Sequence, residues 1–216
     1  MDSLAEERDR MVETQLIRRG LREPRLLAAF ETVPRHLFVP VEYRTHAYQD
    51  RALPIGEGQT ISQPYIVGLM TDLLGLHGGE KVLEVGTGSG YQAAILSRLA
   101  GEVYTIEFNL ELARQAGKSL EETGCRNILF RVGDGAQGWP EAAPFNGILV
   151  TAFGPRVPQP LLDQLAEGGR LAMPVGTPWE QELELWQRRE GGLEHKVIAP
   201  VAFVPLRGEY GWSGEK

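Results

Sequence analysis

The sequence contains almost no cysteine. Among its 216 residues the single cysteine is Cys125, which excludes an intramolecular disulfide and is typical of a protein kept in a reducing cytoplasm. We interpret Cys125 as structural rather than nucleophilic. The four histidines, at positions 36, 46, 77 and 195, are scattered and lack the spacing of metal ligands. We therefore expect a cytoplasmic protein that holds no metal ion.

Long apolar runs and dense positive charge are also missing. No run approaches the roughly 20 apolar residues that a membrane-spanning helix needs. The segment from Met1 to Arg10 is charged and has no apolar centre, so we expect neither a signal peptide nor a membrane partner. The formal net charge is −7 at pH 7, with acidic and basic residues interspersed. Because no basic stripe is present, we expect no nucleic-acid partner.

Strand and helix patterns alternate through the chain after residue 80. Strands are predicted near 82–85, 103–106, 128–132, 145–151 and 169–175, and helices near 91–99, 109–123 and 158–166. This alternation predicts an α/β fold, a doubly wound, mostly parallel sheet with helices on both faces. After Gly176 two further strands, 182–186 and 196–204, flank a Gly191-Gly192 turn and predict an antiparallel edge near the C-terminus.

Helices are also predicted before residue 80, over 4–19, 24–32 and 65–75. The segment 33–64 between them is rich in proline, glycine and aromatic residues, and we predict an ordered loop with a function there. A hydrophobic fraction of 42% is enough for one sizeable core, so we expect a single domain over 1–216.

A glycine-rich turn follows the predicted strand at 82–85. Its spacing is G-x-G-x-G, not the G-x-G-x-x-G of dinucleotide binding, and the absence of Cβ atoms lets a ligand touch the backbone. This favours S-adenosylmethionine, which has no pyrophosphate, although glycine turns also occur for purely structural reasons. The predicted cofactor-binding residues of this segment are Glu84, Gly86, Thr87, Gly88, Ser89 and Gly90.

An acidic residue, Glu107, ends the next predicted strand, 23 residues after Glu84. In a strand-helix-strand unit this position lies where a ribose would sit, and a carboxylate there can accept hydrogen bonds from both hydroxyls. The alternative is a solvated carboxylate at a strand end. The position of Glu107 one unit after the glycine turn favours the nucleoside site.

A Gly133-Asp134-Gly135 turn follows the third predicted strand. We predict that Asp134 accepts a hydrogen bond from an adenine amino group and that Gly135 lets the ring approach. Turns of this kind are also common in loops that bind nothing. The order of this turn after the first two features favours the adenine site.

With these features placed, the chain resembles the protein-L-isoaspartate O-methyltransferase family over nearly its whole length. The specific parts are Thr60-Ile61-Ser62-Gln63-Pro64 and Phe203-Val204-Pro205-Leu206, because many methyltransferases share the glycine motif. The other matching stretches are 33–40, 83–94, 133–135 and 138–139. The chain departs from the family pattern at Asn146, where aspartate is frequent, and at 152–155.

The resemblance implies a Rossmann-like class I methyltransferase fold and repair of damaged proteins or peptides. A methyl group from S-adenosylmethionine would pass to the free α-carboxylate of an L-isoaspartyl residue, leaving S-adenosylhomocysteine. The ester then collapses to a succinimide, whose hydrolysis partly restores aspartate. A carboxylate acceptor is already ionised at neutral pH because its reference pKa is about 3.3–3.9, so no general base is required.

Ser62 is the predicted catalytic residue, because its hydroxyl can donate a hydrogen bond to the acceptor oxygen and orient it. The alternative is an N-cap, since Ser62 precedes Pro64 and a predicted helix. The predicted substrate-binding residues are Thr60, Ile61, Val204, Pro205 and Leu206, with backbone hydrogen bonds to the peptide. His36 and Tyr65 are expected to pack rather than react.

Two other functions stay open at this point. One is a class I methyltransferase with another acceptor, and the other is a nucleoside-binding module without catalysis. Within the domain we expect N-terminal helices and a substrate-side loop (1–80), a cofactor-binding core (81–176) and C-terminal strands (177–216) that complete the sheet and the substrate cleft. We expect the protein to be monomeric.

Overall fold

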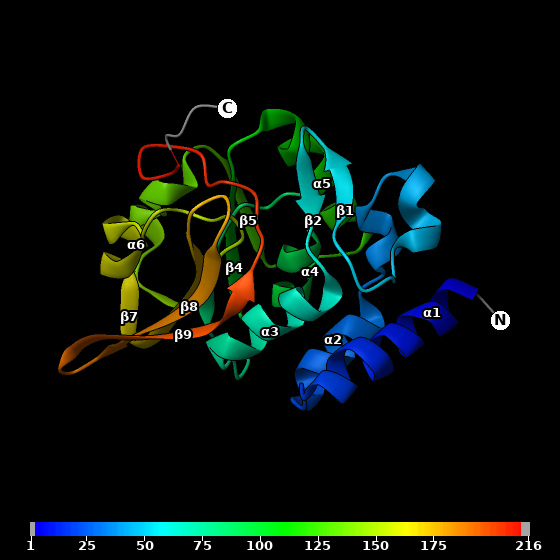
Figure 1. Cartoon of the computed structure of the whole chain (residues 1–216), viewed down its shortest axis with the longest axis horizontal. Coiled ribbons are helices and arrows are strands. Elements are labelled where there is room, and N and C mark those ends of the chain that lie inside the picture. The colour runs from blue at the N-terminus through cyan, green and yellow to red at the C-terminus, as the bar shows by residue number, and fades with distance from the viewer. Residues whose placement is uncertain (1–2, 213–216) are drawn as a thin grey trace.

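A computed structural model of the protein describes residues 3–212 (Figure 1). Its centre is a seven-stranded sheet with the order β5-β4-β3-β6-β7-β8-β9. Strands β3 to β7 run parallel, whereas β8 and β9 pair antiparallel. The strands are β3 (Lys81–Val85), β4 (Glu102–Glu107), β5 (Ile128–Val132), β6 (Phe145–Val150), β7 (Leu165–Gly176), β8 (Gln181–Arg189) and β9 (Gly192–Val201). The predicted α/β fold, doubly wound and mostly parallel with an antiparallel edge, is confirmed.

Helices cover both faces of this sheet. They are α1 (Ser3–Met11), α2 (Pro24–Thr32), α3 (Pro64–Leu74), α4 (Tyr91–Ser97), α5 (Leu110–Glu122) and α6 (Gln159–Asp163). Successive residues of a strand point to opposite faces. Val82 accordingly belongs to the hydrophobic cluster with α1 to α5, and Leu83 to the cluster with α6. The sheet therefore separates two cores.

The strand order places a switch point beside β3. From β3 the chain runs outward through β4 to β5 and then returns to β6 on the other side of β3. Val85 at the end of β3 pairs with Ile106 of β4 and with Val150 of β6. Ligands of open α/β sheets bind outside the carboxyl ends of the strands at such a point, so this end of the sheet is where a site is expected.

Several predicted elements have the predicted bounds, among them α2 and β5. Helix α2 begins at Pro24, whose fixed φ suits a first helical position. The side chain of Glu23 accepts a hydrogen bond from the Arg25 N–H at 3.2 Å and caps the helix. The helical region predicted over 4–19 is right in extent but not in type, because α1 gives way to a π-helical turn (Val12–Leu16) and a 3-10 turn (Ile17–Arg19).

The helix predicted near 158–166 is wrong in its last residues. Helix α6 ends at Asp163, and β7 begins at Leu165 rather than at 169. The Gln164 carbonyl accepts a hydrogen bond from the Phe145 N–H at 2.8 Å, and Leu165 pairs with Phe145. Pairing with the start of β6 therefore removes these residues from the helix.

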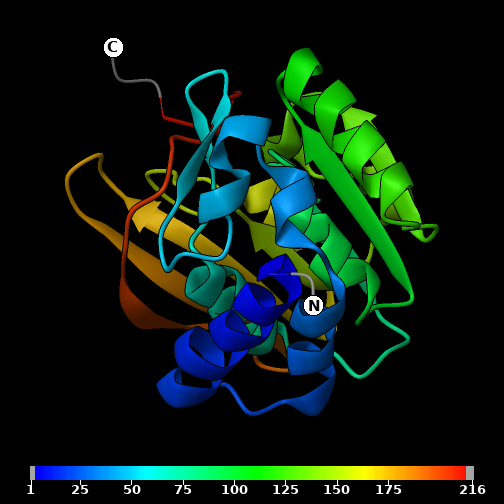
Figure 2. The same cartoon turned by 90° about the vertical axis from the view of Figure 1, so that its right-hand side faces the viewer.

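The segment 33–64 is ordered, but it is more regular than predicted. It contains two 3-10 turns, Arg35–Phe38 and Val41–His46, and a hairpin of β1 (Leu53–Gly56) and β2 (Gln59–Ile61). In both views the hairpin lies at the same end of the molecule as the chain that follows β9 (Figures 1 and 2). The sequence patterns did not predict this hairpin.

Residues 3–212 show neither a membrane-spanning helix nor a cluster of metal ligands. No helix in this range is long and apolar enough to cross a membrane. Within the same range, no group of three or more histidine, cysteine, aspartate or glutamate residues is arranged to hold a metal ion.

Candidate active site

A cavity of about 430 Å³ lies at the carboxyl ends of β3, β4 and β6. This volume is in the range of about 300–1,000 Å³ that small-molecule sites occupy. Its walls are the glycine turn 86–89, the segment 106–112 that follows β4, the β1–β2 hairpin with residues 59–62, and residues 204–207. The cavity thus brings together the predicted cofactor side and the predicted substrate side.

The glycine turn needs glycine for two separate reasons. The φ angles of Gly86, Gly88 and Gly90 are +96°, +54° and +88°, a region that side chains disfavour. A Cβ on Gly86 would also lie 2.5 Å from the Thr151 Oγ1, and that hydroxyl donates to the Gly86 carbonyl at 2.6 Å. The backbone of the turn is therefore held open toward the cavity.

Glu107 is buried and bonded, so the alternative of a solvated strand end is wrong. Only 7% of Glu107 is exposed. Its Oε2 accepts a hydrogen bond from the Gly88 N–H at 2.8 Å, and its Oε1 accepts one from the Asn109 N–H at 2.9 Å. A carboxylate has about four acceptor positions, so two remain for a ligand in the cavity that Glu107 lines. These two can meet the hydroxyls of a ribose.

Glu84 lies behind the glycine turn and does not line the cavity. It is fully buried, and its Oε2 accepts a hydrogen bond from the Thr105 Oγ1 at 2.5 Å. The Thr105 hydroxyl is in turn 2.6 Å from that of Thr87, a residue of the turn. Burial raises the pKa of Glu84 to about 8, and the charge of Glu107 adds to the rise. The Glu84 carboxyl is therefore mostly protonated at pH 7 and reaches the cavity only through the two threonines.

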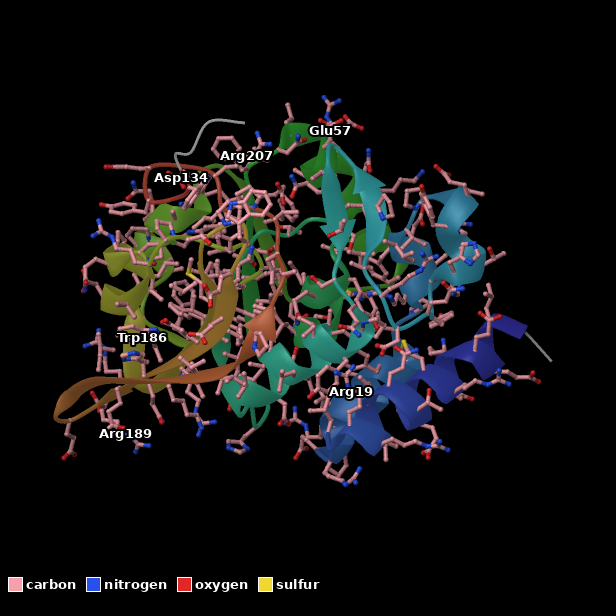
Figure 3. The ribbon with its side chains drawn as sticks, in the orientation of Figure 1. Arg19, Glu57, Asp134, Trp186, Arg189 and Arg207 are labelled. Atoms are coloured by element: carbon pink, nitrogen blue, oxygen red, sulfur yellow. The ribbon has the colours of Figure 1, made fainter. Side chains whose placement is uncertain are left out.

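Only part of the Gly133-Asp134-Gly135 turn reaches the cavity. Gly135 lines the cavity, and a Cβ there would lie 2.5 Å from the Val85 Cγ1. The Asp134 side chain does not line the cavity. Its Oδ1 accepts from the Ala136 N–H and its Oδ2 from the Glu209 N–H, both at 2.9 Å, and it lies beside the C-terminal segment (Figure 3). Contact between Asp134 and an adenine stays a prediction.

Apolar residues that follow Glu107 form a wall that the sequence patterns did not single out. Phe108 and Leu110 line the cavity and are 51% and 59% exposed. Large apolar side chains on a cavity wall are suited to cover a flat ring. Across the cavity, Glu57 at the tip of the hairpin (Figure 3) accepts a hydrogen bond from the Asn109 Nδ2 at 3.2 Å. The hairpin tip is thereby joined to the wall beside Phe108.

All predicted substrate-side residues line the cavity: Thr60, Ile61, Ser62, Val204, Pro205 and Leu206. The N-cap residue of α3 is Gln63, and it makes no side-chain cap bond, so the alternative of Ser62 as the cap is wrong. Within residues 3–212 the Ser62 hydroxyl makes no hydrogen bond. It is free to meet a ligand.

A second cavity of about 530 Å³ adjoins the first. The two cavities share four lining residues, Thr60, Ser62, Thr151 and Val204. Residues 50–52 and 200–203 form the remaining walls together with Gln63 and Ile66. Ser62 therefore stands at a junction between two open spaces.

The positions that depart from the family pattern have structural partners. Phe153 is 2% exposed and pairs with the substrate-side segment, because its N–H donates to the Val204 carbonyl at 2.9 Å and its carbonyl accepts from the Leu206 N–H at 2.8 Å. Asn146, at the opposite end of β6, accepts a hydrogen bond from the Lys81 N–H at 2.9 Å through its Oδ1. The neutral amide oxygen of Asn146 fills this acceptor position, so the hydrogen bond needs no carboxylate.

His36 and Tyr65 pack against polar neighbours, as expected. The Nδ1 of His36 lies 2.8 Å from the Tyr48 hydroxyl, and the Arg19 guanidinium lies 3.4 Å from the centre of the Tyr65 ring. Neither residue lines the two cavities.

The doubly wound sheet, with a glycine turn after β3 and an acidic residue at the end of β4, defines a class I methyltransferase fold. Over residues 6–211 the sequence matches the protein-L-isoaspartate(D-aspartate) O-methyltransferase family, and the chain belongs to that family.

Known relatives are similar over nearly their full lengths. Protein-L-isoaspartate O-methyltransferase 1 of Syntrophobacter fumaroxidans is 56% identical over 207 residues, 96% of this chain and 97% of that protein. The protein-L-isoaspartate O-methyltransferase of Methanoculleus marisnigri is 50% identical over 214 residues, 99% and 97% of the two chains.

Solved structures share the fold. A protein-L-isoaspartate O-methyltransferase superposes with a TM-score of 0.83 at 29% identity, over 94% of this chain and 66% of that longer chain. A Plasmodium falciparum structure in complex with S-adenosyl-L-homocysteine superposes with a TM-score of 0.80 at 23% identity, over 93% and 98% of the two chains. The second comparison supports the fold alone.

Proposed function

We propose that this protein transfers a methyl group from S-adenosylmethionine to the free α-carboxylate of L-isoaspartyl residues in damaged proteins and peptides. The observation that carries the proposal is the place of Ser62. Its free hydroxyl stands where the cavity walled by the glycine turn meets a second cavity. One space suits a nucleoside cofactor, and the other suits a peptide.

The residues of the first cavity fit S-adenosylmethionine. Glu107 has two acceptor positions left for ribose hydroxyls, the turn from Gly86 to Gly88 exposes its backbone, and Phe108 offers an apolar face. When bound, the cofactor supplies an electrophilic methyl group on a sulfonium. Gly135 allows close approach of the ring, and we propose Asp134 as the adenine partner. Glu84 acts indirectly, through the threonine hydroxyls behind the turn.

The acceptor carboxylate needs orientation rather than activation. It is ionised at neutral pH, and the Ser62 hydroxyl can donate a hydrogen bond to one of its oxygens so that the other faces the methyl group. Holding two reactants in a near-attack geometry can contribute roughly 7–11 kcal/mol. No general base is part of this proposal.

The peptide would lie along Thr60, Ile61 and the segment 204–206, where the first cavity meets the second. Phe153 already occupies the Val204 carbonyl and the Leu206 N–H. This leaves the Val204 N–H and the Pro205 carbonyl, within residues 3–212, for backbone hydrogen bonds to the peptide. Such bonds hold an extended chain with little regard for its side chains.

We also propose the oligomeric state, the location and the partners of the protein. The protein is proposed to be a monomer that works as a single domain over 1–216. The single cysteine supports a cytoplasmic location, and the net charge of −7 supports the absence of a nucleic-acid partner. Damaged proteins are the proposed partners.

The proposal is tested by the chemistry of the product. Incubation with labelled S-adenosylmethionine and an isoaspartyl peptide should give a base-labile methyl ester that decays to a succinimide. A product stable to mild base, or labelling of a small-molecule acceptor in place of the peptide, would assign another methyltransferase activity. Binding of S-adenosylhomocysteine with no labelling of any acceptor would identify a module without catalysis.

A further inference from the structure

Arg35 is a fully buried arginine without an acidic partner. Its exposed fraction is 0%, and within residues 3–212 no carboxylate forms an ion pair with it. Burial lowers the pKa of its guanidinium to about 10, so it stays protonated at neutral pH. Burying a charge without a counter-charge is unfavourable unless hydrogen bonds compensate for it. The charge of Arg35 must therefore be stabilised by its uncharged neighbours.

The guanidinium of Arg35 holds two backbone carbonyls from distant segments. Its Nε donates to the Ala47 carbonyl at 2.8 Å, and its Nη2 donates to the Ser62 carbonyl at 2.7 Å. Hydrogen bonds from an ionised donor are shorter and about twice as strong as neutral ones. The planar fork also fixes direction, which the single ammonium of a lysine cannot do. The Ser62 backbone is thus clamped from behind the cavity.

The other neighbours of Arg35 carry no negative charge. Its guanidinium carbon lies 4.9 Å from the centre of the Tyr91 ring, and burial raises the pKa of both Tyr91 and Tyr48. Both tyrosines are therefore neutral at pH 7. Arg8, the remaining charged group near these rings, is itself a cation. The two carbonyls and the face of the Tyr91 ring are the groups that stabilise the charge, so the Ser62 carbonyl is bound tightly.

Arg35 also connects the two halves of the site. Tyr91, on which it packs, is the first residue of α4 and follows Gly90 of the glycine turn. On the other side of Ser62, the Gln63 Nε2 donates to the Asp50 Oδ1 at 2.8 Å. The backbone of Ser62 is therefore fixed, whereas its hydroxyl remains free.

We propose that Arg35 is a positioning residue that holds the Ser62 backbone so that the Ser62 hydroxyl points at the acceptor carboxylate. This inference rests on the proposed function and on the role of Ser62 in it. Arg35 lines neither cavity, and its route to the acceptor side is the Ser62 carbonyl. Its other neighbour, Tyr91, lines the first cavity, so the cofactor affinity serves as a check on that contact. A displacement of the reacting groups by about 1 Å can lower a rate on the order of 100-fold.

The test compares Arg35→Lys and Arg35→Met with the control Arg188→Lys. Arg188 is half-buried and also donates through Nη2 to a backbone carbonyl, that of Leu162 at 2.6 Å, but it lines neither cavity. Three quantities are measured: kcat and KM on an isoaspartyl peptide, the Kd of S-adenosylhomocysteine, and Tm. We expect kcat to fall about 10- to 100-fold in Arg35→Lys, with the Kd within about twofold of wild type, and Arg188→Lys to keep wild-type kinetics.

A double-mutant cycle with Ser62→Ala separates a positioning role from a structural one. If Arg35 acts through Ser62, the variant carrying both Arg35→Lys and Ser62→Ala should be no slower than the worse single variant. Additive losses, an unchanged kcat in Arg35→Lys, or a Kd that rises as much as kcat falls would overturn the proposal. So would failure of both Arg35 variants to fold.

The same data distinguish this inference from the proposed function. If the wild-type protein does not methylate the isoaspartyl peptide, the proposed function fails and the inference fails with it. If the wild type is active and Ser62→Ala is slow while Arg35→Lys is not, only the inference about Arg35 fails.

Discussion

The Glu107 carboxylate and the Gly88 N–H are joined by a hydrogen bond of 2.8 Å. This bond ties the end of β4 to the glycine turn that follows β3. Because the Asn109 N–H donates to the other oxygen at 2.9 Å, the carboxylate is oriented before a ligand arrives. A preorganised acceptor loses less entropy on binding, so the site presents a fixed pair of acceptor positions to a ribose.

Glu107→Ala should weaken cofactor binding first. It removes the acceptor of two ribose hydroxyls and leaves the Gly88 N–H without its partner. Hydrogen bonds to a charged group contribute about 1.5–3 kcal/mol each, so the affinity for S-adenosylhomocysteine should fall tenfold or more in calorimetry. Glu102→Ala, an exposed position at the other end of β4, is the matched control. An unchanged affinity in folded Glu107→Ala would show that Glu107 only supports the turn.

Ser62→Ala should lower turnover and leave the cofactor site intact. Loss of one hydrogen bond to a charged oxygen corresponds to about 1.5–3 kcal/mol, or at least tenfold in rate if the bond is strongest in the transition state. Since Gln63 is the N-cap of α3, the free energy of unfolding should change by less than about 0.5 kcal/mol. Steady-state rates and the melting temperature are measured on the same preparation of the variant. Normal turnover per folded molecule would show that the Ser62 hydroxyl has no role in the reaction.

Glu84→Gln should change how stability depends on pH. Glu84 ionises near pH 4.5 when exposed, whereas burial raises its pKa to about 8 in the folded state. Between these values the folded state binds more protons than the unfolded state, so the wild-type free energy of unfolding falls as pH rises, by up to about 1.4 kcal/mol per pH unit. The variant lacks this loss, so its stability relative to wild type should increase from pH 5 to pH 8 in urea unfolding. Parallel curves for the two proteins would contradict the assignment.

Two glycine substitutions should have opposite effects on stability. Gly86→Ala places a Cβ 2.5 Å from the Thr151 Oγ1 at a φ of +96°, so it should destabilise the fold by about 1–3 kcal/mol and weaken S-adenosylhomocysteine binding. Gly117→Ala lies within α5, where nothing is within 4 Å of the added Cβ, and should stabilise by roughly 0.5–1 kcal/mol. Chemical denaturation of both variants checks the contrast. Equal effects would show that the turn does not require glycine.

Local patterns in the sequence predicted most of the sheet because buried parallel strands and amphipathic helices have distinct periods. They failed where tertiary contacts decide. Leu165 has no local reason to leave a helix, and it does so because Phe145 pairs with it. The β1–β2 hairpin was missed because its tip contains Glu57, a non-glycine residue at a φ of +52°. The one local sign of a turn is that Glu57 lies between Gly56 and Gly58.

The site was predicted unevenly for the same reason. Glu107 ends a strand and Ser62 belongs to a family motif, so the sequence alone was enough to predict that both line the cavity. The partners of Asp134 could not be predicted, because Glu209 is 75 residues away along the chain. Arg35 gave no signal either, since arginine is almost never fully buried and its bond to the Ser62 carbonyl spans 27 residues.

The central claim is tested most directly with a pair of peptides that differ in one linkage. Each is offered with labelled S-adenosylmethionine, one containing isoaspartate and the other aspartate at the same position. The account predicts base-labile methyl ester on the isoaspartyl peptide and almost none on its aspartyl twin. Equal labelling of the two peptides, or labelling of neither, would contradict it.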